Sequence, residues 1–126
     1  MKIRLRKNSI RLRLLQSEVK QLEKSGAVTE EIHFNKAQIL IYTLKISNTA
    51  TEICAFFETN KITVEIPEKA ARIWTATAQI GLEFEQKIGD GAALKITIEK
   101  DFICVQRPLD PDNSDAFPQP ESNCSK

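Results

Sequence analysis

The first thirteen residues, MKIRLRKNSIRLR, alternate between apolar and basic side chains and contain no acidic residue. Their six basic residues are Lys2, Arg4, Arg6, Lys7, Arg11 and Arg13. Because successive side chains of a β-strand point to opposite faces, this pattern places apolar residues on one face and cations on the other. The segment therefore predicts a half-buried basic ribbon, whose cations need a neutralising partner.

The basic charge is local, because the whole chain of 126 residues has a formal net charge of only +1. An apolar share of 41% and a charged share of 28% are typical of a globular domain that buries its own core. No apolar run reaches the roughly 18 residues that cross a bilayer, and no signal-peptide pattern is present. We therefore expect a cytoplasmic protein with no membrane partner.

Cysteine usage agrees with that expectation. The three cysteines, Cys54, Cys104 and Cys124, are an odd number and have no Cys-x-x-Cys spacing. This favours unpaired thiols in a reducing compartment.

Hydrophobic periodicity predicts an α+β fold, with a mainly antiparallel sheet and two short helices on one face. The helices are expected at 16–25 and 68–77, the first stopped by Gly26 and the second started after Pro67. For residues 2–14 a hairpin turning at 7–9 and a single bent strand are both compatible with the pattern. The expected strands are 2–6, 10–14, 27–34, 38–46, 52–58, 61–66, 80–87 and 93–100.

The two halves of the chain share a hydrophobic pattern at an offset of 52 residues. Ile10 falls on Ile62, Leu22 on Trp74, and the pattern continues through the following pairs: Leu12 and Val64, Leu14 and Ile66, Val19 and Ala71, Val28 and Ile80, Ile32 and Phe84. Both halves then read as a β-α-β-β pseudo-repeat. Almost no identities accompany the pattern, so duplication and convergent patterning both account for it.

The C-terminal part differs in composition. Residues 107–126 hold four of the five prolines together with many Asp, Asn and Ser residues. Such a segment buries too little apolar surface to offset its ordering entropy. We expect one α+β domain over residues 1–106, followed by a largely disordered tail.

The basic ribbon is the main candidate for a functional surface. In a two-residue hairpin Arg4 lies opposite Arg11, and like charges facing each other are destabilising. Neutralisation can come from carboxylates on neighbouring strands, from solvent, or from an external anion that accepts the bidentate fork of arginine. The candidate binding residues are Arg4, Arg6, Arg11 and Arg13. The candidate internal charge partners are Glu83, Glu85, Glu99 and Asp101, and we expect Asp101 to pair with an N-terminal arginine.

The sequence indicates no catalytic centre, cofactor or metal site. The only histidine, His33, has no second ligand at metal spacing. Nucleic acid is disfavoured, because aromatic residues do not interleave with the basic ones. Cys54 and Cys104 lie in apolar strands, where cysteine behaves as a small hydrophobic residue.

Residues 83–87 (EFEQK) resemble the E-x-E-x-K signature of the triphosphate tunnel hydrolases. In that family alternating carboxylates hold a divalent metal, and basic side chains bind a triphosphate inside a closed barrel. The family carries the motif in its first strand, whereas here it begins at Glu83, and the family's further carboxylates are not found.

The opening MKIRLRKNSIRLRLLQSEV and the later EKDFICVQRP resemble a small family of uncharacterised bacterial proteins, a domain of unknown function. The resemblance implies a bacterial cytoplasmic protein with one compact domain, and it implies no substrate. The positions that would recur are Arg11, Arg13, Asp101, Phe102, Cys104 and Arg107. The family pattern leads us to expect Thr at position 15 as a helix cap, whereas this chain has Leu15.

Three functional hypotheses follow. The first is a non-enzymatic binding module, whose basic sheet face takes a phosphate-type anion or an acidic protein surface. The second is a scaffold or accessory protein that oligomerises through a strand edge, with its arginines paired internally. The third, a remote alternative, is a hydrolase of phosphoanhydrides.

Overall fold

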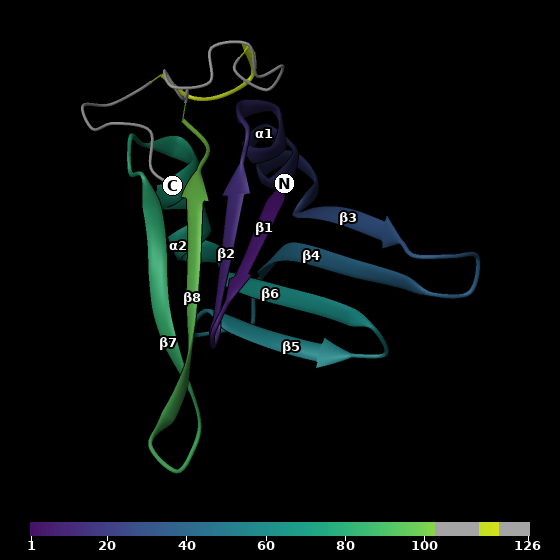
Figure 1. Ribbon diagram of the computed structural model, residues 1–126. Coiled ribbons are helices and arrows are strands. Elements are labelled where there is room, and N and C mark those ends of the chain that lie inside the picture. The colour runs from purple at the N-terminus through teal and green to yellow at the C-terminus, as the bar shows by residue number, and fades with distance from the viewer. Residues whose placement is uncertain (103–113, 119–126) are drawn as a thin grey trace.

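The computed structural model describes residues 1–102 and 114–118, and it contains two four-stranded sheets and two helices (Figure 1). Sheet A has the strand order β1-β2-β8-β7, and sheet B has the order β3-β4-β6-β5. The elements are β1 (Lys2–Arg6), β2 (Ser9–Leu14), α1 (Gln16–Ser25), β3 (Ala27–His33), β4 (Ile39–Ser47), β5 (Cys54–Glu58), β6 (Lys61–Pro67), α2 (Glu68–Ala76), β7 (Gly81–Gly89) and β8 (Ala92–Lys100).

The α+β class predicted from periodicity is confirmed, and each helix and strand lies within two residues of its predicted bounds. The strands form two sheets, however, where the sequence suggested one. Each sheet joins two antiparallel hairpins through one central parallel pair, β2 with β8 and β4 with β6. The alternation of apolar and polar residues in a strand shows which face of the strand is buried. It does not show which hairpins share a sheet.

Residues 2–14 form the hairpin rather than a bent strand. Its register places Arg4 opposite Arg11 and Lys2 opposite Arg13, as the two-residue turn predicted. Lys7 adopts the positive φ that such a turn requires, with φ of 50°. The equivalent turn between β5 and β6 uses Thr59 and Asn60, both with positive φ.

The pseudo-repeat predicted from the hydrophobic pattern corresponds to a structural repeat. Each half has the order strand, strand, helix, strand, strand, so the hairpin before each helix belongs to the repeat as well. Exchanging the halves converts the order β1-β2-β8-β7 into β5-β6-β4-β3, which is sheet B read backwards.

The offset of 52 holds for the first hairpins and the helices but changes to 54 beyond them. Ala27 pairs with Lys45 in sheet B, and the corresponding pair in sheet A is Gly81 with Glu99. The change arises because residues 77–80 separate α2 from β7, whereas Gly26 alone separates α1 from β3. The predicted equivalences of Val28 with Ile80 and of Ile32 with Phe84 are therefore wrong by two residues; Val28 corresponds to Leu82. A shift of two keeps every strand side chain on its face, so the pattern alone could not reveal it.

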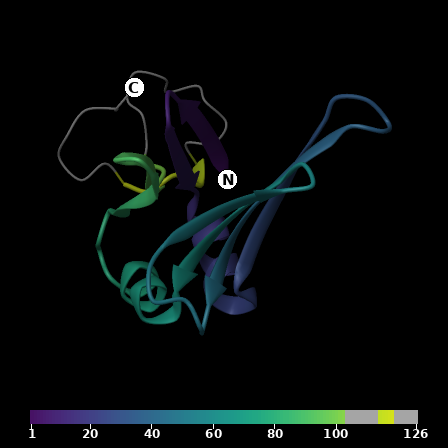
Figure 2. The same ribbon diagram turned by 90° about the horizontal axis from the view of Figure 1, so that it is seen from below.

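The core lies between the two sheets and under the helices. The helices contact each other, and α1 contacts strands of both sheets. Figure 2 shows the hairpins of sheet B extending away from the helices. Trp74 is fully buried, and its indole N–H donates to the Ile80 carbonyl at 3.0 Å. The other large, fully buried side chains are Leu12, Leu14, Leu22, Leu44, Val64, Ile66, Ile96 and Ile98.

Polar contacts join the two sheets along both flanks. On one flank the Gln86 side chain of β7 accepts from Ala55 N at 2.6 Å and donates to Ala55 O at 3.0 Å. On the other flank the buried amino group of Met1 pairs with Glu18 and Glu30, and the Tyr42 hydroxyl donates to Met1 O at 2.7 Å.

A short segment of the predicted tail packs on the domain. Residues 114–118 lie against the start of α1, and Phe117 contacts the core cluster. The prediction of disorder for 107–113 and 119–126 falls outside the described residues.

Candidate anion-binding site

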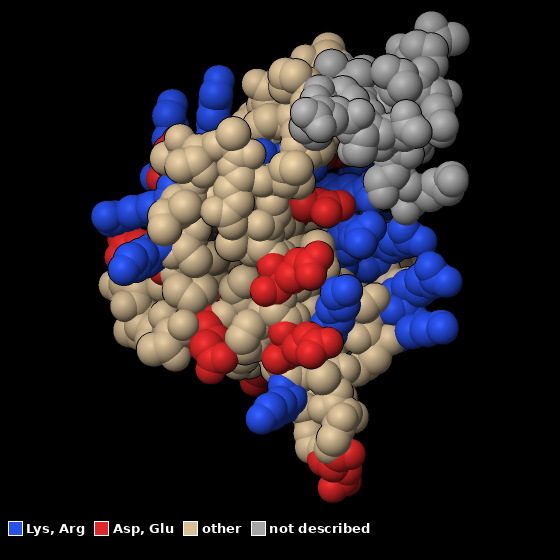
Figure 3. Space-filling model, turned by 90° about the vertical axis from the view of Figure 1, so that its left-hand side faces the viewer, with Lys and Arg blue, Asp and Glu red and all other residues tan. Residues whose placement is uncertain are grey.

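The outer face of sheet A is a grid of polar side chains. Strands β1, β2 and β8 place their outward residues in rows across the sheet, which the register defines. The first row is Lys2, Arg13 and Glu99, the second is Arg4, Arg11 and Thr97, and the third is Arg6, Ser9 and Lys95. Figure 3 shows basic side chains gathered beside acidic ones on this side of the molecule.

Internal carboxylates neutralise the cations at the end of the sheet near α1. Arg13 Nε donates to Glu99 Oε1 at 2.8 Å, and Arg11 Nε lies 3.8 Å from the same oxygen. The ion pair of Asp101 is with Lys2, at 2.9 Å, rather than with an arginine of the described chain. Asp101 thus connects the end of β8 to β1 as expected, but through Lys2 instead of the expected arginine.

The other end of the face is a basic hollow of about 580 Å³. Arg6 and Lys95 form no ion pair within residues 1–102 and 114–118, and Arg11 has only the long contact to Glu99. Within residues 1–102 and 114–118, no carboxylate lines this hollow. The lining residues are Arg4, Arg6, Ser9, Ile10, Arg11, Lys95 and Thr97.

Glu83 and Glu85 do not reach the basic ribbon. Both lie exposed on the edge strand β7, which β8 separates from β2. Neither forms an ion pair with another described residue. The E-x-E-x-K segment thus lies on an open sheet face, beside Thr97 and Lys95 of β8.

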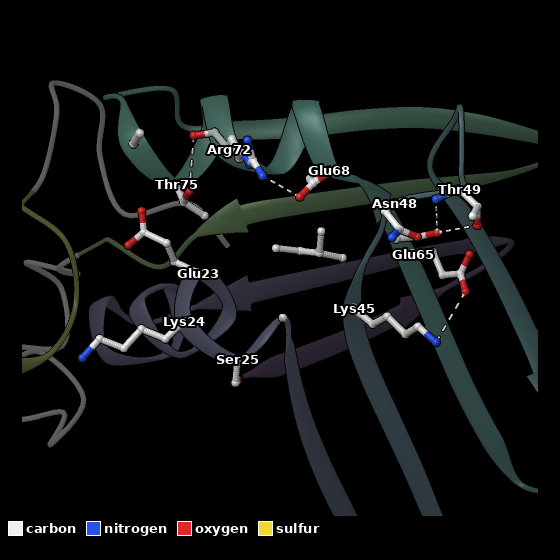
Figure 4. Close-up of a pocket in the computed structure, with 14 residues that line it drawn as sticks. Glu23, Lys24, Ser25, Lys45, Asn48, Thr49, Glu65, Glu68, Arg72 and Thr75 are labelled. Carbon is white, nitrogen blue, oxygen red and sulfur yellow. Dashed lines mark hydrogen bonds and ion pairs between the residues drawn. The ribbon is translucent and has the colours of Figure 1, made fainter.

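A second hollow, of about 840 Å³, lies between the end of α1, the end of β4 and α2 (Figure 4). Two of its cations are paired with carboxylates of the same wall. Arg72 donates to Glu68 at 2.6 Å, and Lys45 lies 3.9 Å from Glu65. A phosphate-type dianion in this hollow would have to displace Glu65 and Glu68 from their cations, so the basic hollow is the better site for such an anion.

Cys54 and His33, the other candidates within the described residues, line neither of these two hollows. Burial raises the pKa of the Cys54 thiol, with Glu65 acting in the same direction, so little thiolate forms near neutral pH. His33 is exposed and contacts Glu31 at 2.9 Å. In the described part of the chain no three His, Cys, Asp or Glu side chains gather as metal ligands do. Cys104, Cys124 and Arg107 lie outside the described residues.

Sequence reasoning missed Lys95 and Thr97 as members of the basic hollow. They enter it because β8 lies parallel to β2, with Ser9 opposite Lys95 and Arg11 opposite Thr97. Their outward alternation was visible in the segment ALKITIEK. The parallel partner that brings them beside the arginines was not.

The helices of the described residues are too short and too polar to span a membrane. Neither a curated protein nor a solved structure matches the chain. Residues 1–121 match a family described as "Family of unknown function (DUF7009)". Since the match covers nearly the whole chain, the protein belongs to this family.

Proposed function

We propose that the protein is a non-enzymatic binding module that takes a phosphate-type anion in the basic hollow of sheet A. The observation that carries the proposal is the contrast along one sheet face. Carboxylates pair with the cations at one end, whereas Arg6, Arg11 and Lys95 line a hollow to which the described part of the chain contributes no carboxylate. As the family resemblance implies, we place this function in a bacterial cytoplasm.

The hollow has the geometry that a phosphate group needs. Neighbouring strands lie about 4.8 Å apart, and outward side chains repeat about every 6.8 Å along a strand. Side chains of adjacent rows therefore converge on one bound group. Guanidinium groups bind phosphate in a bidentate manner, and Arg6 and Arg11 lie in adjacent rows of this face. The hydroxyl of Thr97, on the floor of the second row, adds a polar contact.

The proposal is tested by thermal unfolding in the presence of inorganic phosphate and pyrophosphate at constant ionic strength. A ligand that binds only the folded state stabilises it by mass action, so Tm is expected to rise with pyrophosphate concentration. Arg6→Gln and Lys95→Gln are expected to weaken this rise.

Lys87→Gln is the matched control, because Lys87 is an exposed lysine on β7 that does not line the hollow. It should retain the full response. An unchanged Tm of the wild type at every anion concentration contradicts the proposal, as does an equal loss of response in Lys87→Gln.

A second candidate, self-association through a strand edge, is favoured by one observation. Strand β5 is an edge of sheet B, and its Phe57 is 68% exposed beside an apolar hollow of about 260 Å³. Exposed apolar edges favour pairing between chains. Light scattering is expected to show a dimer that Phe57→Lys dissociates; a wild-type monomer at all concentrations would rule this candidate out.

A further inference from the structure

The structural repeat gives the molecule two corresponding places, one beside each helix. The first place lies where α1 begins and β8 ends, and residues 114–118 occupy it. The second place lies where α2 begins and β4 ends, and it is the hollow of about 840 Å³ shown in Figure 4. One place is thus filled by a segment of the chain, and its counterpart is a pocket.

The segment in the first place is held by main-chain and side-chain contacts. Gln16 N donates to Asp115 O at 2.9 Å, and Ser17 N donates to the Asp115 carboxylate at 3.1 Å. Phe117 N donates to Asp101 O at 2.7 Å. An acidic residue thus caps the helix, where the helix dipole favours negative charge.

The aromatic residue two positions later fills the space between helix and strand. The ring of Phe117 stacks edge-on against Phe102, with centroids 5.9 Å apart. The ammonium group of Lys100 lies 5.6 Å from the Phe117 ring and 5.8 Å from the Trp74 ring. The segment thus contacts the first place through an acidic side chain, an aromatic side chain and its main chain.

The repeat assigns counterparts at the second place to four residues of the first. At the offset of 52, Gln16 and Ser17 correspond to Glu68 and Lys69; at the offset of 54, Lys100 and Asp101 correspond to Ile46 and Ser47. Three of these four counterparts, Glu68, Ile46 and Ser47, line the pocket.

The differences between the two places still suit a similar occupant. The start of α2 has no side-chain hydrogen bond as a cap, because Pro67 stands at that position. Lys69 adds a cation where Ser17 stands at the first place. Ile46 offers an apolar surface where Lys100 contacts the ring of Phe117. Glu68 is already paired with Arg72, at 2.6 Å.

We propose that this pocket, between α2 and the end of β4, binds a short peptide segment of a partner protein. The segment carries an acidic residue at the start of α2 and an aromatic residue two positions later over Ile46. The pocket volume of about 840 Å³ lies within the range of roughly 300–1,000 Å³ typical of ligand sites. The proposal does not depend on anion binding by sheet A, because the two sites share no residue.

The test titrates the isotope-labelled full-length protein with a capped peptide, Ser-Asp-Ala-Phe-Pro, which copies residues 114–118. Backbone amide resonances report where it binds. We expect saturable shifts at Asn48 and Lys69, weakened about tenfold by Lys69→Glu, which replaces attraction of the peptide carboxylate by repulsion. Replacing Asp or Phe of the peptide by Ala should weaken binding comparably.

A second variant keeps the test sharp. Ala76→Trp places a large side chain in the wall of the pocket, and it should abolish the shifts. Ala92→Trp, at the exposed turn between β7 and β8, is the matched control and should bind normally. If Ala76→Trp does not fold, the exposed Lys69→Glu carries the test alone.

Two results would overturn the proposal. One is the absence of shifts at Asn48 and Lys69 at any peptide concentration. The other is a shift confined to Gln16 and Ser17, which would mean that the peptide only displaces the chain's own segment.

Discussion

Gly81 shows how tightly sheet A is assembled at single positions. It lies on β7 opposite Glu99, the carboxylate that pairs with Arg13. A Cβ atom at this position would stand 2.8 Å from Ile98 O and 3.0 Å from Glu99 Cβ. The glycine is required by this close approach of two strands.

We therefore expect Gly81→Ala to lower the free energy of unfolding by about 1–3 kcal/mol, because the strands must move apart. Urea denaturation measures the change. Glu83→Ala, at the next outward position of β7, should change stability by less than about 0.5 kcal/mol. Equal effects of the two substitutions would show that the close approach carries no cost.

Tyr42 couples folding to alkaline pH. Burial raises the pKa of its phenol above 10.0, and the charges of Glu30 and Glu18 act in the same direction. Because the pKa is higher in the folded state, the stabilisation is fully present below pH 10.0 and is lost as pH rises through the folded value.

The wild type is thus expected to lose stability above about pH 10 more steeply than Tyr42→Phe, which has no phenol to ionise. Urea midpoints of both proteins between neutral and alkaline pH measure the difference. Parallel pH profiles would contradict it. At neutral pH Tyr42→Phe should itself cost about 1 kcal/mol, because Met1 O loses its donor.

Helix α1 depends on a residue far along the chain for its N-terminal cap. Leu15 stands at the N-cap and offers no side-chain acceptor, although Glu18 accepts from Leu15 N at 2.8 Å. The carboxylate of Asp115 takes the role that the family pattern led us to expect of Thr at position 15. It accepts from both the backbone N and the hydroxyl of Ser17.

Asp115→Ala is expected to destabilise the protein by about 0.5–2 kcal/mol, the usual cost of losing a helix cap. Ser17→Ala should be partly redundant with it, since both remove the same side-chain contact. A double-mutant cycle of unfolding free energies measures that coupling. Strict additivity would mean that the contact between Asp115 and Ser17 contributes nothing.

At the scale of elements, periodicity predicted most of the fold. Helix α1 was predicted at its observed bounds, since Val19 and Leu22 have helical spacing and Gly26 ends the helix with φ of 84°. The opposition of Arg4 and Arg11 followed from turn length alone. The union of β2 with β8 could not be predicted, because parallel partners far apart in sequence leave no local signal. The pairing of β2 with β8 brings Lys95 and Thr97 into the basic hollow. The sequence therefore indicated only the arginines of the site.

At the scale of the whole molecule the two halves of the chain depend on each other, because each sheet takes a hairpin from each half. Sheet A needs β1 and β2 from the first half, and β7 and β8 from the second. Neither half can bury the inner face of its own hairpins without the other.

We therefore expect fragments 1–51 and 52–126 to be unfolded when separate and to regain β structure when mixed. Circular dichroism and NMR dispersion measure this. The refolded mixture should melt at a temperature that rises with fragment concentration, whereas Tm of the intact chain should not depend on concentration. A separately folded 1–51 fragment would contradict the interpretation.

The strand orders also determine when each sheet has all of its strands during translation. All strands of sheet B have been synthesised when translation reaches Pro67, whereas sheet A lacks β8 until translation reaches Lys100. During that interval the apolar face of the β1–β2 hairpin is exposed. Nascent chains with such exposed surface aggregate or bind chaperones. All strands of sheet B are thus synthesised before the last strand of sheet A, and the earliest strands of the chain are among the last to gain their partners.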